Sequence, residues 1–501
     1  MNSRNQAFYL QDTWRAGRRL TLNLGVRLEN EFLPPFVKEV NGISVANPVS
    51  FGWGDKVAPR LGAAWDVKGD GRWKAAASFG IFYDVLKYEL ARGSFGSDVW
   101  FTHVYTLDRP DVTNLTKANP GANGREVITF DNRTIPINAQ GQLEGIDPAI
   151  KPYKSREFSV SLDHQFSPKL VGGIRYTRKD LIRGIEDIGV LDASDSEVYL
   201  IGNPGFGQTR DKSSVYGGTT PNGTFLVPKA TRKYDGVELR IQGSVKEKLH
   251  FLASYTWSRL FGNYSGAANS DESGRSDPGV SRAFDLPYYY FDESGSQQTR
   301  EGLLGTDRPH AFKLFAYYNF TTGAGTSNIG VTQIAYSGVP DSTSVIYLSA
   351  PTFPFGRGDM GRTDAYIQTD LNLAHSFNVR KGMRLRFEAN VRNLFDQSGV
   401  ISRVTQYNRS GAISAKQLPL NKFFSGYNVN DFVNPQNNTG SGVPYNPIYG
   451  LPGASYRAGG GPGQSRAIGA IADRSAFSAA NPNFGAYQDF RVIRLGVTLV
   501  F

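Results

Sequence analysis

The chain has 501 residues, and its 55 lysines and arginines outnumber its 45 aspartates and glutamates, which gives a formal net charge of +10. It contains no cysteine, which excludes a disulfide scaffold, a thiolate metal site and a cysteine nucleophile. No run approaches the roughly 18 apolar residues of a membrane-spanning helix, and residues 1–6 lack the apolar segment of a signal peptide. The composition leaves one membrane architecture open, a β-barrel in which only every second residue faces lipid.

Segments in which apolar and polar residues alternate recur along the whole chain. In the clearest segment, Leu20, Leu22 and Leu24 alternate with Thr21 and Asn23, and the pattern continues to residue 29. A period of two is that of a β-strand and not of a helix. The predicted strands lie near residues 5–15, 19–30, 56–68, 71–84, 154–166, 169–182, 233–245, 248–261, 307–320, 328–337, 363–377, 382–395 and 488–501. Alternation is poorest in 328–337.

Many of these segments reach about ten residues, the length that a tilted membrane strand needs and more than an ordinary globular strand has. Their second faces carry Arg, Glu, Asn and Gln, which suits a watery lumen better than a packed interior. Aromatic residues near the strand ends are expected to form an interfacial girdle. These are Phe8, Trp14, Trp65, Trp73, Phe166, Phe320, Phe377 and Phe501.

The connections between the predicted strands alternate in length. Short turns are expected at 15–19, 68–71, 167–169, 246–248, 321–327 and 378–382. Long connections rich in Gly, Asn, Ser and Pro occupy roughly 31–55, 85–153, 187–232, 262–306, 338–362 and 396–487. This organisation is typical of outer-membrane barrels. The sequence therefore predicts an all-β fold, a membrane-spanning, antiparallel, up-and-down β-barrel with short periplasmic turns and long extracellular loops.

The direction of the first and last strands predicts that the barrel is partial. The first strand runs into a short turn, and the last follows a long connection, so both run from the long-loop side to the short-turn side. Their number is then odd, whereas bacterial single-chain barrels normally have an even number of strands. We therefore expect residues 1–501 to be the C-terminal portion of a larger barrel, about 13 strands of 22.

Several motifs in the expected order resemble a known family. Arg494 to Phe501 (RLGVTLVF) is similar to the C-terminal signal read by the barrel-assembly machinery, and Leu385 to Asp396 (LRFEANVRNLFD) resembles a late-barrel pattern. The other similar segments are AFYLQDTW at 7–14, LTLNLGVR at 20–27, PRLGAAW at 59–65, GIFYD at 80–84, DRPHAF at 307–312 and DAYIQTDLNL at 364–373. Together they resemble the TonB-dependent outer-membrane receptors, and within them the Oar-like group.

The resemblance implies a bacterial outer-membrane location and energy-coupled uptake of a ligand, which binds extracellular loops and a plug. No plug, TonB box or signal peptide is recognised within 1–501, so TonB would act only through an N-terminal part. The implied partners are outer-membrane lipid and lipopolysaccharide, the barrel-assembly machinery through the C-terminal strand and Phe501, and an extracellular ligand that the sequence does not identify.

Exposed aromatics often mark recognition surfaces. Trp100 and Phe101, and the run of Tyr288, Tyr289, Tyr290 and Phe291, fall in predicted extracellular loops. They are candidate ligand contacts, for example by stacking on sugars or gripping a peptide. The alternative is that these loops simply fold over one another.

The charge pattern and the motifs argue against other functions. There is no basic run of five or more residues, so nucleic acid is not an expected partner. The basic excess is explained by lumenal pairs such as Arg384 and Arg386 with Glu388, or by contact with lipopolysaccharide phosphates at the rim. No Gly-x-Ser-x-Gly elbow is present, and no enzymatic activity, metal or cofactor is expected.

Two other functions stay open at this stage. One is a structural or adhesion barrel of the outer membrane that carries out no active transport. The other is a soluble, secreted, all-β carbohydrate-binding or hydrolytic protein, which would show paired carboxylates in a cleft.

Overall fold

The computed structural model describes residues 2–34, 39–40, 43–44, 49–86, 101–106, 125–131, 146–147, 149–191, 197–206, 227–264, 289–291, 296–299, 301–342, 345–347, 350–353, 356–380, 382–401 and 487–501. Within these ranges the secondary structure consists of β-strands and turns, and no helix is long and apolar enough to cross a membrane.

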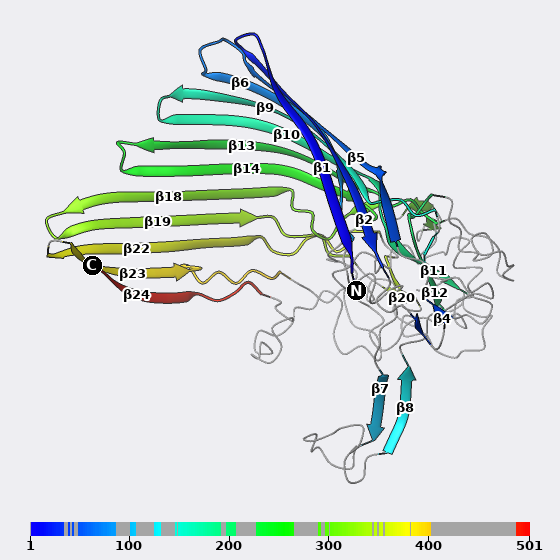
Figure 1. Ribbon diagram of the computed structural model, residues 1–501. Helices are drawn as coiled ribbons and strands as arrows, with labels where there is room; N and C mark the ends of the chain where they lie inside the picture. The colour runs from blue at the N-terminus through cyan, green and yellow to red at the C-terminus, as the bar shows by residue number, and fades with distance from the viewer. Residues whose placement is uncertain are drawn as a thin grey trace.

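Thirteen strands follow one another in a single antiparallel sheet. They are β1 (Arg4–Ala16), β2 (Leu20–Leu33), β5 (Val49–Asp66), β6 (Trp73–Tyr83), β9 (Lys154–Ser167), β10 (Leu170–Arg183), β13 (Arg232–Val245), β14 (Leu249–Gly262), β18 (His310–Thr322), β19 (Gly325–Tyr336), β22 (Tyr366–Arg380), β23 (Met383–Arg392) and β24 (Val492–Val500). Figure 1 shows a strongly curved sheet whose short turns line up along one end. The sheet is not closed, because β1 and β24 are its two edges.

All thirteen predicted strands are confirmed, including the weakest one, which is β19. The prediction that 31–55 is a loop is wrong for residues 49–55, because β5 begins at Val49 and pairs with β2 beyond a register shift between Glu29 and Glu31. The turn predicted at 321–327 is also too long, since β18 and β19 pair as far as Thr322 and Gly325.

The long connections contain short strands that the sequence analysis missed. They are β3 (Glu39–Val40) with β4 (Ile43–Ser44), β7 (Phe101–Thr106) with β8 (Arg125–Asp131), β11 (Glu186–Leu191) with β12 (Glu197–Gly202), β15 (Tyr289–Phe291) with β16 (Gln297–Thr299), and β20 (Val345–Tyr347) with β21 (Ala350–Thr352). The two-residue β17 (Gly302–Leu303) pairs with the end of β14. Two to seven residues are too few for alternation to be recognised.

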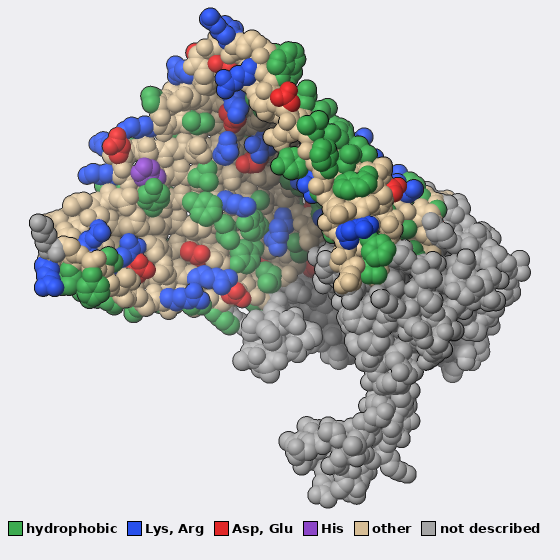
Figure 2. Space-filling view, in the orientation of Figure 1, with side chains coloured by type: hydrophobic (Ala, Val, Ile, Leu, Met, Phe, Trp, Pro, Cys, Tyr) green, Lys and Arg blue, Asp and Glu red, His purple; other side chains and the backbone are tan. Residues whose placement is uncertain are grey.

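The strand register gives the sheet two different faces. On the convex face, large apolar side chains are exposed, among them Trp65, Val160 and Leu239, as expected for a surface in contact with lipid. Their neighbours along the strands point to the concave face, where Ser159 hydrogen-bonds Ser78 and Arg240 pairs with Asp163. Figure 2 shows a dense band of hydrophobic side chains along β1 and β2, and scattered charged side chains over the hollowed face of the later strands.

Aromatic side chains gather near the short turns, on the convex face. The rings of Trp73 and His164 are stacked with centroids 3.9 Å apart, and Phe166 meets the His164 ring edge-on at 4.7 Å. Trp14 and Trp65 are also about half exposed at this end. This arrangement fits the girdle expected at a membrane–water interface.

A small hydrophobic core lies at the opposite end of the sheet, where the long connections begin. Leu33, Val49, Phe51, Leu86, Ile146, Ile185 and Ile201 are buried together there. They come from strand ends and from the β11–β12 hairpin, so burial of their side chains ties that hairpin to the sheet.

Candidate lumenal site

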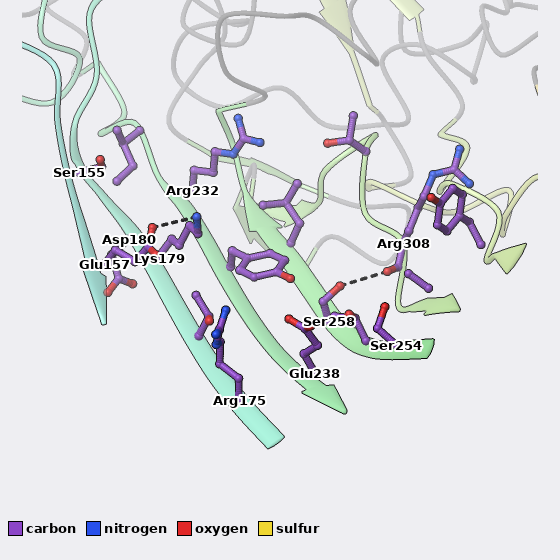
Figure 3. Close-up of a pocket in the computed structure, with 18 of the residues that line it drawn as sticks. Ser155, Glu157, Arg175, Lys179, Asp180, Arg232, Glu238, Ser254, Ser258 and Arg308 are labelled. Atoms are coloured by element: carbon purple, nitrogen blue, oxygen red, sulfur yellow. Dashed lines mark hydrogen bonds and ion pairs between the residues drawn. The ribbon is translucent and has the colours of Figure 1, made fainter. Parts of the chain in front are cut away.

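The concave face carries a hollow of about 1220 Å³ between the middle of the sheet and its long-connection end. Strands β9, β10, β13, β14, β18, β19 and β22 all contribute to its wall. Figure 3 shows side chains from neighbouring strands pointing into this space. We call this surface the lumenal site.

Strand periodicity explains which side chains reach the lumenal site. Along β10, Arg175, Thr177 and Lys179 line it, whereas the residues between them belong mainly to the convex face. On the neighbouring strands, Glu238 lies opposite Arg175, and Glu157 lies opposite Lys179. Cross-strand pairing therefore places charges from several strands side by side.

The charge of the lumenal site is predominantly positive. The described side chains that line it include six cations, Arg156, Arg175, Lys179, Arg232, Arg308 and Lys313, and three carboxylates, Glu157, Asp180 and Glu238. Lys179 and Glu157 form an ion pair at 2.8 Å. Arg175 and Glu238 face each other in register, yet neither belongs to an ion pair among the described residues. The wall thus retains cationic groups that a negatively charged solute can contact.

Arg308 is a cation of the lumenal site that several contacts hold in place. One of its guanidinium nitrogens donates to the Ser337 carbonyl at 2.7 Å, and the guanidinium carbon lies 5.7 Å from the centroid of the Tyr336 ring. Its own carbonyl accepts a hydrogen bond from the Ser258 hydroxyl at 3.1 Å. Burial lowers the pKa of Arg308 below its ordinary value, although the group remains a cation at neutral pH.

Two tyrosines pack together at the long-connection edge of the lumenal site, and one of them, Tyr153, lines the hollow. Tyr264 is only 1% exposed and packs with Ala230, and Tyr153 and Leu181 lie against this pair. The rings of Tyr153 and Tyr264 are tilted, with centroids 6.4 Å apart. Burial raises the pKa of both phenols, so both stay neutral at physiological pH. Tyr153, which lines the hollow, thus contributes an uncharged side chain at its edge.

The chemistry available at this surface is recognition by charge and hydrogen bonding. Hydroxyl groups of Ser155, Thr177, Ser254 and Thr256 lie among the cations. Within the described ranges, no group of three or more His, Asp or Glu side chains is placed to hold a metal ion. The arrangement suits a solute with carboxylate, phosphate or hydroxyl groups.

The side chains of the aromatic residues predicted from sequence are not among those that the structure describes. Trp100 and Tyr288 lie outside the described residues. Phe101 begins β7, and Tyr289–Phe291 form β15, but only the backbone of these strands is described. Their role as ligand contacts stays a prediction.

The sequence analysis foresaw a polar inner face but missed the residues of the lumenal site. Alternation identifies which side chains point inward, as it did for Arg386, whose guanidinium contacts Glu388. Alternation does not show which inward-pointing residues on different strands are cross-strand neighbours. Cross-strand register supplies that information, and it depends on turns and bulges that were placed only approximately.

Comparisons with known proteins agree with this architecture. A family model described as "Outer membrane beta barrel domain" matches residues 1–338. That match covers more than half of the chain, so the chain belongs to this family of outer-membrane β-barrels. It is accordingly a protein of the bacterial outer membrane.

A curated relative of the chain belongs to a particular class of outer-membrane transporter. The chain is 29% identical over 410 residues to the TonB-dependent transporter Oar of Myxococcus xanthus, a match that covers 78% of this chain and 35% of that protein. The chain is thus a homologue of a TonB-dependent transporter and spans about a third of its length.

Solved structures of receptors are also similar. The outer membrane transporter YddB from Escherichia coli superposes with a TM-score of 0.48 at 12% identity, covering 82% of this chain and 43% of that one. The siderophore receptor PiuA from Acinetobacter baumannii gives a TM-score of 0.41 at 14% identity, covering 81% and 40%.

Proposed function

We propose that residues 1–501 form a barrel portion of a TonB-dependent outer-membrane receptor and serve in the energy-coupled uptake of a ligand. The observation that carries this proposal is the contrast between the two faces of the thirteen-stranded sheet. The convex face is apolar over most of its height, and the concave face holds a polar, predominantly cationic hollow. A wall of this kind separates lipid from an aqueous path.

The lumenal site favours a ligand that carries anionic groups. Six cations accompany three carboxylates there, and Arg175 forms no ion pair among the described residues. The aromatics of 100–101 and 288–291 would make the first contacts outside the membrane. In this proposal the sheet contributes binding and passage and catalyses no reaction, in keeping with relatives that are transporters and receptors.

Two protein partners follow from the proposal. TonB would act through a plug held within the barrel, and the concave face would surround that plug. The barrel-assembly machinery would recognise β24 and Phe501, which is 88% exposed at the end of an edge strand. An edge strand with free backbone groups is a natural template for pairing with another strand.

The proposal is tested by solute depletion from the growth medium. Three isogenic strains are compared: one with the intact gene, one with it deleted, and one without TonB. Mass spectrometry of the spent medium should reveal an anionic solute that only the intact strain removes. If deletion of the gene changes no solute, the uptake function is refuted, and an adhesion or structural function is favoured. Depletion that persists without TonB refutes energy coupling.

A further inference from the structure

The convex face changes abruptly from apolar to charged near the long-connection ends of β9, β10, β13 and β14. In one cross-strand row, Val160, Tyr176, Val237 and Trp257 are neighbours on this face. Two residues further along each strand, the row reads Phe158, Arg178, Asp235 and Arg259, and the next reads Arg156, Asp180, Lys233 and Phe261. A step of two residues is only about 7 Å along a strand.

These rows define a group that we call the charged collar: Arg156, Arg178, Asp180, Lys233, Asp235 and Arg259. Four cations accompany two carboxylates, and Arg156 and Asp180 also border the lumenal hollow where their strands end. The collar lies just above apolar rows that face lipid, so the hydrophobic part of the membrane ends beneath it. Charges on the lipid side are tolerated only at such an interface.

The carboxylates hold two of the arginines in place. Asp180 accepts from Arg156 at 3.0 Å and from Arg178 at 3.1 Å, and Arg178 also reaches Asp235 at 3.3 Å. The Tyr176 hydroxyl donates to Asp235 at 2.6 Å. The guanidinium groups remain about half exposed, so some of their N–H donors still point outward.

The other two cations have no carboxylate partner among the described residues. Lys233 and Arg259 are exposed on the convex face, and neither forms an ion pair within the part of the chain that the structure describes. The Arg259 guanidinium carbon lies 4.6 Å from the centroid of the Phe261 ring, which fixes it near the surface. The collar therefore presents a preorganised excess of positive charge beside the membrane.

We propose that the charged collar binds the phosphate groups of lipopolysaccharide in the outer leaflet. Arginine and lysine donors match phosphate oxygens, and the apolar rows directly below them match the acyl chains of the same lipid. A soluble anion would use the cations but leave the apolar rows uncovered. The inference rests on the outer-membrane location of the chain and is independent of the proposed uptake function.

The test measures binding of fluorescent lipid A to the purified full chain in detergent. The phosphorylated lipid A should bind at least about tenfold more tightly than the same lipid without phosphates, since each charge-assisted hydrogen bond contributes roughly a tenfold factor. Added sodium chloride should weaken the binding. Inorganic phosphate alone should displace little lipid, and full displacement would show a site for free phosphate and overturn the proposal.

Variants locate the site. Lys233→Gln/Arg259→Gln removes two exposed cations without breaking an ion pair, so the chain should fold, and its affinity for phosphorylated lipid A should fall about tenfold. Lys233→Arg/Arg259→Lys should retain most of the affinity. The matched control, Lys246→Gln/Lys248→Gln, removes two cations from the short turn at the other end of β13 and β14 and should leave lipid A binding unchanged. Equal losses in the two glutamine variants, or no loss in either, would overturn the proposal.

Discussion

At the scale of single residues, Lys56 is a fully buried charged side chain among the residues that the structure describes. Its side chain is fully buried on β5, where it contacts Glu31 and donates to the Asp84 carbonyl at 3.0 Å. A carboxylate oxygen of Glu29 lies 3.9 Å from the ammonium group, and Arg27 holds the other oxygen of Glu29 at 2.5 Å. Phe51 and its apolar neighbours cover this cluster.

Replacing Lys56 by Met should lower the free energy of unfolding by about 3 kcal/mol, because Glu31 would remain buried without its cation. The double variant Lys56→Met/Glu31→Gln should recover part of this loss, since it removes both charges. Urea titration of the detergent-solubilised protein, followed by tryptophan fluorescence, measures both changes. A Lys56→Met variant as stable as the parent would show that the pair is not needed in the folded state.

A second residue-scale prediction concerns the ion pair between Lys169 and Glu247, which joins two adjacent short turns at 2.7 Å. The hydrogen bond from Lys169 holds the pKa of Glu247 below its ordinary value. Because the folded pKa is the lower one, the pair stabilises the folded state above the unfolded pKa. This contribution is lost as the pH falls through the folded pKa.

An NMR titration of the Glu247 side chain should therefore give a pKa below that of a free glutamate, and Lys169→Gln should return it toward the ordinary value of a glutamate. Lys248→Gln, in the same turn, is the control and should leave the titration almost unchanged. An unshifted Glu247 in the parent protein would contradict the pair.

At the scale of elements, the β13–β14 turn carries backbone strain. Lys246 and Glu247 have φ of 50° and 56°, a left-handed conformation that these side chains disfavour. The Lys248 amide donates to the Val245 carbonyl at 3.1 Å, which closes a tight hairpin turn. Positive φ at two successive residues is the geometry for which Asn-Gly is preferred.

Replacement of Lys246 and Glu247 by Asn and Gly should therefore raise the free energy of unfolding by about 1 kcal/mol. The reason is that relief of backbone strain should outweigh loss of the exposed ion pair between Lys169 and Glu247. The same urea titration measures this change. As a control, Lys248→Asn lies outside the left-handed pair and should give no comparable gain. A destabilised Asn-Gly variant would argue against the strained turn.

The two faces of one strand should respond differently to a new charge. Leu239 is on the convex face of β13 and 48% exposed, whereas Gln242 points to the concave face of the same strand. Leu239→Lys should destabilise the protein in lipid bilayers by about 2–4 kcal/mol, and Gln242→Lys should have little effect. Folding titrations in vesicles compare the two. Equal effects would mean that the assignment of the faces is wrong.

Alternation was sufficient to predict these thirteen strands, because one face must meet lipid and the other water over ten or more residues. It worked well for β2 and β13, whose patterns are nearly regular. Alternation failed where backbone geometry sets the pairing of strands. It did not predict that β5 pairs with β2 beyond the register shift between Glu29 and Glu31. It also missed the short hairpins and the lumenal site, which depend on register between strands distant in the sequence.

At the scale of the whole molecule, one curved sheet places every short turn at one end and the strand ends that lead into the long connections at the other. The aromatic girdle marks the membrane boundary near the short turns, and the charged collar lies close to the opposite boundary. The convex face between them is predominantly apolar. Together these features define the central claim, that the sheet crosses the outer membrane with its short turns in the periplasm.

Single cysteines test this claim directly, because the sequence contains none. Gly54, in the long-connection end of β5, and Gly323, in a short turn, are both positions where an added Cβ meets no atom within 4 Å. On intact cells, a membrane-impermeant maleimide should label Gly54→Cys, and it should label Gly323→Cys only after the outer membrane is permeabilised. Labelling of Gly323→Cys on intact cells, with Gly54→Cys protected, would contradict this orientation of the sheet.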